Sequence, residues 1–196
     1  MSGRTGSISR TTSETSITVL IDLDDASEGS LSTGVGFFDH MLHALARHGR
    51  FGLTVDASGD LHIDAHHTVE DVGIALGQAF RKALGDRVDI ERYGHAYAPL
   101  DEALARVVID CSGRPFLEFN ATFPEASIGE QFDASLIEEF WRGFAVHAGL
   151  TIHIDLLRAR NSHHAAEAIF KAGAISLRTA VRQTGSGVPS TKGVLQ

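Results

Sequence analysis

The feature that most constrains this chain is a polar motif that occurs once in each half. The segment 66–70 (His-His-Thr-Val-Glu) returns as 163–167 (His-His-Ala-Ala-Glu). The two copies lie 97 residues apart in a chain of 196 residues, a spacing of about half its length. We therefore expect two copies of one folding unit, each carrying the same set of functional side chains.

Hydrophobic periodicity predicts the same order of elements in both halves. In the first half we expect strands over 14–24, 30–35 and 51–64, the last interrupted at 58–59, and helices over 37–48 and 68–84. In the second half we expect strands over 103–111, 116–123 and 150–157, and helices over 133–147 and 163–182. Each half therefore reads strand, strand, helix, strand, helix, with its first two strands paired. Helices covering one face of each sheet give an α+β architecture.

These patterns also suggest boundaries along the chain. Residues 1–13 are rich in Ser, Thr, Gly and Arg and are expected to form a flexible arm. The first repeat half then covers residues 14–92 and the second covers 93–183. Residues 184–196 contain Gly, Pro and Ser and are expected to form a C-terminal loop.

Composition argues against several classes of partner. The formal net charge of −8 disfavours a nucleic acid. With Cys111 as its one cysteine, the chain forms no internal disulfide, which fits a reducing compartment. The N-terminus lacks the apolar run of a secretory signal, and no segment approaches the ~20 apolar residues that span a bilayer. We therefore expect a cytoplasmic protein that binds neither nucleic acid nor membrane.

The duplicated motif has the spacing of a metal-binding site. On a helix, residues three or four apart share a face, so the glutamate of each copy shares a face with its histidines. Neighbouring residues point about 100° apart, so the two histidines of a pair can serve two different ions. The shorter helices also correspond, because His40 lies opposite Glu139 at a spacing of 99 residues. The candidate metal ligands are His40, His66, His67, Glu70, Glu139, His163, His164 and Glu167.

Nitrogen and carboxylate ligands without a thiolate suit Mn or Fe better than tetrahedral Zn. The candidate ligands divide most naturally into two metal sites, each with a mixture of His and Glu. One alternative stays open within it, because Glu138 rather than Glu139 could turn inward.

Basic and hydroxyl side chains are candidates for a phosphate pocket, although each alone is more often a solvated group. Guanidinium, ammonium and hydroxyl donors together suit a phosphate. His48 lies near a helix end, where it can complement the helix dipole or contact a ligand. The candidate set is Arg92, Arg114, Lys171, Ser190, Thr191 and Lys192.

Several segments closely resemble the imidazoleglycerol-phosphate dehydratase family. They are GVGFFDHMLHALARHGRF, DAHHTVEDVGIALGQAF, PLDEAL, SGRP, NSHHAAEAIFKA and GVPSTKGVL, in the family's order and spacing from about Arg10 onwards. The resemblance implies a lyase of histidine biosynthesis that dehydrates imidazole glycerol phosphate to imidazole acetol phosphate through a metal-stabilised imidazolate. It also implies two Mn²⁺ ions per active site and a cage of 24 subunits with active sites between subunits. Each half would be a four-stranded sheet backed by two helices, as in domain 2 of ribosomal protein S5.

The family's roles can be transferred to matching positions. The metal ligands would be the eight candidates above. Glu14, at the start of the first strand, would be the proton shuttle. The chain departs from the family at Glu139, where many relatives have His, and at His43-Ala44, where others have an acidic residue and Gln. The catalytic set would be Glu14, His66, His67, Glu70, His163, His164 and Glu167, and the substrate contacts Glu14, His40, His48, Arg92, Arg114, Lys171, Ser190, Thr191 and Lys192.

Two other functions are compatible with paired metal sites. A two-metal phosphate hydrolase would also use neighbouring ions, but the aspartate-rich ligand sets expected there are missing from the sequence. A structural protein could use the metals only to join subunits. The first would release inorganic phosphate, and the second would show no catalysis when metal is returned.

Overall fold

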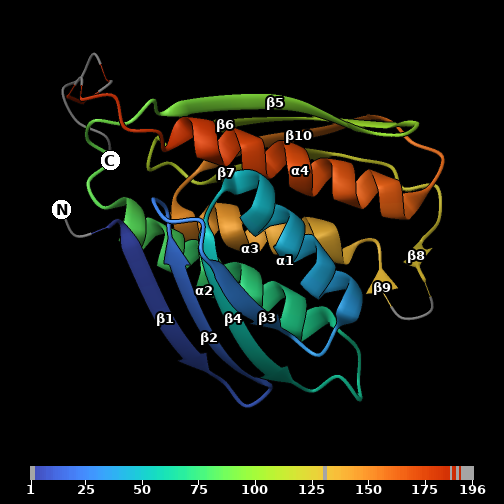
Figure 1. Ribbon diagram of the computed structural model, residues 1–196. Coiled ribbons are helices and arrows are strands. Elements are labelled where there is room, and N and C mark those ends of the chain that lie inside the picture. Colours follow the sequence, from blue (N-terminus) through green and yellow to red (C-terminus); the bar gives the residue numbers. More distant parts are fainter. Residues whose placement is uncertain (1–2, 130–131, 186, 189, 191–196) are drawn as a thin grey trace.

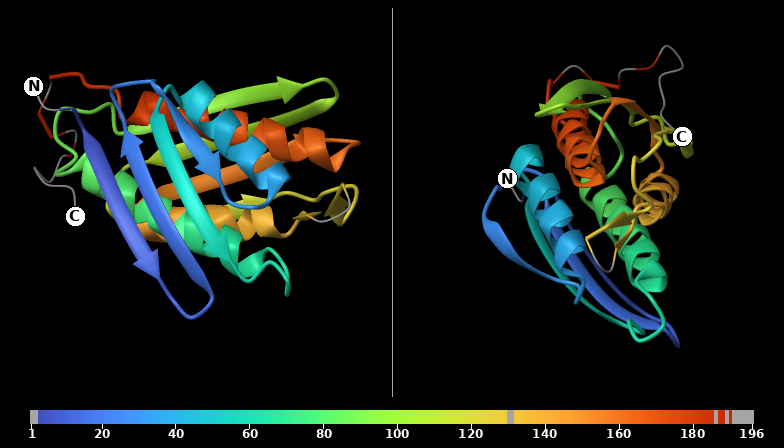
Figure 2. Two further views of the ribbon diagram at one scale, coloured as in Figure 1. Left: turned by 60° about the horizontal axis from the view of Figure 1, so that its bottom comes forward. Right: turned by 90° about the vertical axis from the view of Figure 1, so that its right-hand side faces the viewer.

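The computed structural model describes residues 3–129, 132–185, 187–188 and 190 of the chain. In this part of the chain, four helices lie between two four-stranded sheets (Figures 1 and 2). The first half consists of β1 (Thr5–Thr11), β2 (Thr15–Asp22), β3 (Glu28–Ser32), α1 (Gly36–Gly49), β4 (Gly52–Gly59) and α2 (His66–Leu84). The second consists of β5 (Tyr93–Leu100), β6 (Ala103–Asp110), β7 (Phe116–Asn120), β8 (Ser127–Ile128), β9 (Phe132–Asp133), α3 (Leu136–Ala148), β10 (Thr151–Arg158) and α4 (Ser162–Ala180).

The two sheets have the same topology, which confirms the duplication. The strand orders are β1-β2-β4-β3 and β5-β6-β10-β7. In the first sheet β3 runs parallel to β4, and in the second β7 runs parallel to β10. The first two strands of each half form an antiparallel hairpin. The helix that follows the third strand, α1 or α3, makes the crossover that a parallel pair requires. The expected α+β fold of two tandem sheet-and-helix units is therefore confirmed.

The hydrophobic core lies between the sheets and is shared by both halves. In β2 the alternate residues Ile17, Val19 and Ile21 are buried against the helices, while the intervening side chains face outward. Helix α2 packs along α3, and α1 packs along α4. Fully buried aromatic side chains such as Phe140 and Trp141 fill the space between them. The pairing of helices across the halves places the start of α1 beside the start of α4.

A glycine in each half lets the first strand approach its helix closely. A Cβ atom on Gly6 would lie 1.9 Å from the carbonyl oxygen of Ala79, and one on Gly94 would lie 1.9 Å from that of Ser176. Any larger residue would force the strand away from the helix. The same packing contact therefore recurs in both copies of the unit.

The structure corrects four expectations. Residues 5–11 form β1 rather than a flexible arm, and β5 is a further strand that the periodicity did not predict. The strands expected to pair, now β2 with β3 and β6 with β7, do not pair, because β3 hydrogen-bonds to β4 and β7 to β10. Residues 61–63 form a turn rather than a strand. No helix among the described residues combines the length and apolar character needed to cross a membrane.

Candidate active site

The first turns of α2 and α4 position the duplicated histidines. His66 and His67 are the first two residues of α2, and His163 and His164 follow the first residue of α4. The amide of His164 donates a 3.0 Å hydrogen bond to the side chain of Asn161, which caps α4. The first turn of α2 and that of α4 therefore each orient two imidazole rings in different directions.

One group of candidate metal ligands is assembled within the described residues. The Nε2 atoms of His40 and His163 lie 3.1 and 3.5 Å from Oε2 of Glu167. These three ligand atoms all lie within 4.8 Å of one another. His40 reaches the group from α1, which packs against α4. Two imidazole nitrogens and one carboxylate oxygen that converge in this way fit a divalent cation such as Mn²⁺ or Fe²⁺.

The carboxylate of Glu167 is fixed on both sides. Its Oε1 lies 2.6 Å from Nζ of Lys171, while Oε2 faces His40. Burial raises the pKa of Glu167, but the hydrogen bonds from Lys171 and His40 outweigh burial, and the pKa lies below its usual value. The group is therefore an ionised and oriented acceptor.

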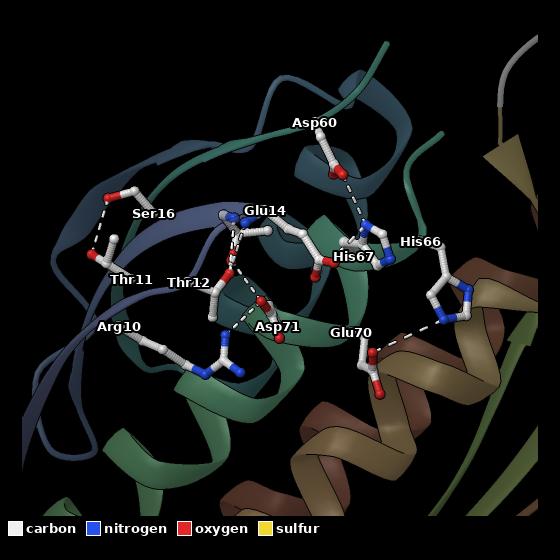
Figure 3. Close-up of polar contacts among 11 residues, drawn as sticks. Arg10, Thr11, Thr12, Glu14, Ser16, Asp60, His66, His67, Glu70 and Asp71 are labelled. Atoms are coloured by element: carbon white, nitrogen blue, oxygen red, sulfur yellow. Dashed lines mark hydrogen bonds and ion pairs between the residues drawn. The ribbon is translucent and has the colours of Figure 1, made fainter. Parts of the chain in front are cut away.

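The corresponding ligands of the first half do not converge to the same extent. His66 Nε2 lies 4.0 Å from Oε2 of Glu70 (Figure 3). Glu139 comes from α3, which packs on α2, but its Oε2 lies 3.8 Å from Nε of Arg142. Glu138 pairs with the same guanidinium. The assignment of either glutamate as a ligand thus stays a prediction.

The second histidine of each pair bonds to a carboxylate outside the predicted site. Nδ1 of His67 lies 3.0 Å from Oδ2 of Asp60 and 4.0 Å from Oε2 of Glu14. Figure 3 shows Glu14 and Asp60 both directed towards His67, whereas His66 faces Glu70. Nδ1 of His164 lies 2.9 Å from Oε2 of Glu102.

These contacts change the pKa values of the groups concerned. The hydrogen bond with Asp60 raises the pKa of His67, and that with Glu102 raises the pKa of His164. The His164 contact also lowers the pKa of Glu102 to about 2. Sequence reasoning missed Asp60 and Glu102. A signal was available for Glu102, which precedes β6 as Glu14 precedes β2.

The predicted phosphate ligands are not all close to the histidines. Arg92 and Arg114 converge on Asp110, with Nε of Arg92 2.7 Å from Oδ1 and Nη2 of Arg114 3.9 Å from Oδ2. The amide of Arg92 bonds to the carbonyl oxygen of Ala180, at the end of α4. His163 lies at the other end of α4, about 25 Å away at 1.5 Å per residue.

The remaining predicted substrate contacts are spread along the molecule. Lys171 lies midway along α4, beside Glu167. His48 lines a hollow of about 690 Å³ together with Arg178, which donates a 3.1 Å hydrogen bond to the His48 carbonyl oxygen. Burial and the nearby charge of Lys171 lower the pKa of His48. Ser190 is in the final described segment, whereas Thr191 and Lys192 lie outside the described residues.

The fold and these contacts define a duplicated α+β protein with a histidine–carboxylate cluster between its halves. The family model for imidazoleglycerol-phosphate dehydratase matches residues 33–177. The chain belongs to the imidazoleglycerol-phosphate dehydratase family, and it is an enzyme of the hydro-lyase class.

Named relatives and solved structures agree with that membership. The imidazoleglycerol-phosphate dehydratases of Aminomonas aminovorus and Methylobacillus flagellatus are each 60% identical to the chain over 196 residues, covering 98% of it and 100% and 98% of their own lengths. The crystal structure of the Staphylococcus aureus enzyme matches with a TM-score of 0.84 at 43% identity, covering 92% of this chain and 99% of that one. The Pyrococcus furiosus enzyme, in complex with (S)-C348, matches with a TM-score of 0.85 at 39% identity, covering 96% and 100%.

Proposed function

We propose that this enzyme dehydrates imidazole glycerol phosphate to imidazole acetol phosphate in a reaction that depends on Mn²⁺. Family membership supports the reaction and its place in histidine biosynthesis. The observation that carries the metal dependence is the convergence of His40, His163 and Glu167, whose ligand atoms lie within 4.8 Å of one another.

The ligand set fits a hard or borderline cation that takes several nitrogen and oxygen ligands. His40, His163 and Glu167 would hold one ion, and His66, Glu70 and Glu139 are the corresponding positions of the other half. His67 and His164 would bind metal through their Nε2 atoms, because Nδ1 of each ring is hydrogen-bonded to a carboxylate. Bound at these ligands, two Mn²⁺ ions per active site would supply Lewis acidity towards the nitrogen atoms of the substrate ring.

Side chains of the protein would carry out the proton transfers and bind the phosphate. Dehydration removes a hydroxyl group and a carbon-bound proton as water. The resulting enol then takes up a proton at carbon and loses its O–H proton as it becomes the ketone. Glu14 is suited to carry these protons, because its carboxylate is half exposed and lies 4.0 Å from His67. Arg92, Arg114, Lys171 and the 190–192 segment would bind the phosphate and so orient the substrate.

The product assay tests the reaction directly. Purified enzyme with added Mn²⁺ is incubated with imidazole glycerol phosphate, and products are separated and identified by mass. We expect imidazole acetol phosphate without release of inorganic phosphate. Release of phosphate would support a two-metal hydrolase instead. A metal-loaded protein with no product would support a purely structural role for the ions.

We also propose that the active sites form between subunits of a large assembly. The Arg92–Arg114 pair lies about 25 Å from His163 along α4, which is too far for one small substrate to contact both. A neighbouring chain can bring the two together. The family's cage of 24 chains of 21.0 kDa would have a mass of about 500 kDa, which light scattering measures.

Complementation between inactive variants tests this arrangement. Arg92→Ala and Glu167→Gln should each be inactive when every chain carries the change. If the two residues of one site come from different chains, co-expressed variants form some sites that lack both changes. Random mixing then restores about a quarter of parental activity. Activity no higher than that of the separate variants would contradict a shared site.

A further inference from the structure

Glu14 and Glu102 occupy equivalent places in the two halves. Each directly precedes the second strand of its sheet, β2 or β6, at the turn of the first hairpin. Each also faces Nδ1 of the second histidine in its half, His67 or His164. Duplication alone would therefore give both glutamates the same role.

Their contacts nevertheless differ. Oε2 of Glu102 lies 2.9 Å from Nδ1 of His164, and Oε1 accepts a 3.2 Å hydrogen bond from the amide of Arg160. The side chain of Glu102 is 18% exposed, compared with 48% for Glu14. Glu14 lies 4.0 Å from His67, beyond hydrogen-bonding distance. Thus Glu102 has both oxygens engaged, whereas Glu14 makes no hydrogen bond to the histidine it faces.

Asp60 accounts for this difference. Asp60 follows β4, and its Oδ2 lies 3.0 Å from Nδ1 of His67. Glu102 has the same relation to Nδ1 of His164. In the second half, β10 is followed by Ala159 and Arg160, neither of which has a carboxylate. Asp60 therefore makes the hydrogen bond to His67 in place of Glu14. At His164 the corresponding hydrogen bond is made by Glu102 itself.

We propose that Glu102 is a positioning residue that fixes His164 for metal binding, while Asp60 does the same for His67 and leaves Glu14 available to the substrate. An acceptor at Nδ1 holds the proton there, so the lone pair of Nε2 points outward to a metal. With both oxygens bonded, Glu102 does not exchange protons with a substrate. The two hairpin glutamates thus have different roles despite their equivalent positions. This inference rests on the proposed function, since it assumes that His67 and His164 bind metal.

Metal affinity and turnover, measured separately, test this division of roles. We would compare Glu102→Ala, Glu102→Gln and Glu14→Gln, with Glu118→Ala as a matched control that removes an exposed carboxylate from β7. Mn²⁺ affinity is measured without substrate, by competition with a chelating indicator. Turnover is measured at saturating Mn²⁺.

Glu102→Ala should weaken the binding of Mn²⁺ by about 10- to 100-fold, with turnover at saturating Mn²⁺ within a few-fold of the parent. Glu102→Gln keeps an acceptor oxygen and should recover part of the affinity. Glu14→Gln should show the opposite result, with parental Mn²⁺ affinity and little turnover. Asp60→Ala, a second variant that removes the acceptor from His67 and leaves the β5–β6 hairpin intact, should weaken Mn²⁺ binding as Glu102→Ala does.

Two results would overturn the proposal. One is parental Mn²⁺ affinity in both Glu102→Ala and Asp60→Ala. The other is a loss of turnover in metal-saturated Glu102→Ala as severe as that in Glu14→Gln. A parent that binds Mn²⁺ but forms no product would refute the proposed function, and the affinity measurements would still decide whether Glu102 positions His164.

Discussion

Replacing Glu167 with glutamine is expected to remove one Mn²⁺ ion per chain and to lower turnover by about 10³-fold, because Lewis-acid stabilisation contributes several kcal/mol. Glu167 is the shared member of the assembled cluster, since its Oε2 faces Nε2 of both His40 and His163. The amide of glutamine has no negative charge. It also leaves Lys171 beside the site without its ionic partner at 2.6 Å. Both effects disfavour a bound cation.

Metal analysis of the gel-filtered variant, together with the product assay, checks this result. Glu118→Gln is the control, because it removes an exposed carboxylate on β7 and should retain both metal content and turnover. A Glu167→Gln variant with parental metal content would show that the cluster is not a metal site. Normal thermal unfolding of the variant would exclude a general loss of structure.

Replacing Glu14 with glutamine is expected to lower turnover by about 10²- to 10⁴-fold while leaving metal content unchanged. Its carboxylate is 48% exposed and lies 4.0 Å from His67, so it is close to the predicted site without being held by the histidine. Glutamine has nearly the same shape but does not accept and return a proton. The loss should therefore appear in kcat rather than in Mn²⁺ affinity.

Single-turnover measurements at saturating Mn²⁺ and substrate separate this effect from weaker binding. Asp25→Asn, an exposed acidic residue in the loop before β3, is a suitable control for the loss of one negative charge. Full turnover by a metal-loaded Glu14→Gln enzyme would remove Glu14 from the mechanism and direct attention to another proton carrier.

The repeated motif predicted the main features of the fold, because its spacing follows directly from the duplication. The periodicity did not predict β1, since Gly6 is its only buried residue and its other side chains are small, polar or partly exposed. The expected pairing of β2 with β3 was also wrong. Sequence neighbours favour hairpins, whereas the parallel pairing of β3 with β4 depends on the crossover through α1.

The site was predictable as a set of residue types, but its geometry was only partly so. Helical spacing related Glu167 to His163, and the correspondence of the shorter helices suggested His40. The carboxylates that bind Nδ1 of His67 and His164 come from loops, and no local periodicity marks them. Asp60 lies 7 residues before His67, and Glu102 lies 62 residues before His164. The separation of Arg92 from the histidines follows from the length of α4 in the folded chain.

Titration of the metal-free enzyme with Mn²⁺ tests the central claim most directly. Chelator-stripped protein is supplied with increasing equivalents of Mn²⁺, and formation of imidazole acetol phosphate is measured at each step. The account predicts no product without metal and a rate that saturates at two equivalents per chain. Full dehydration by protein that has lost all metal, or no dehydration when both sites are filled, would contradict it.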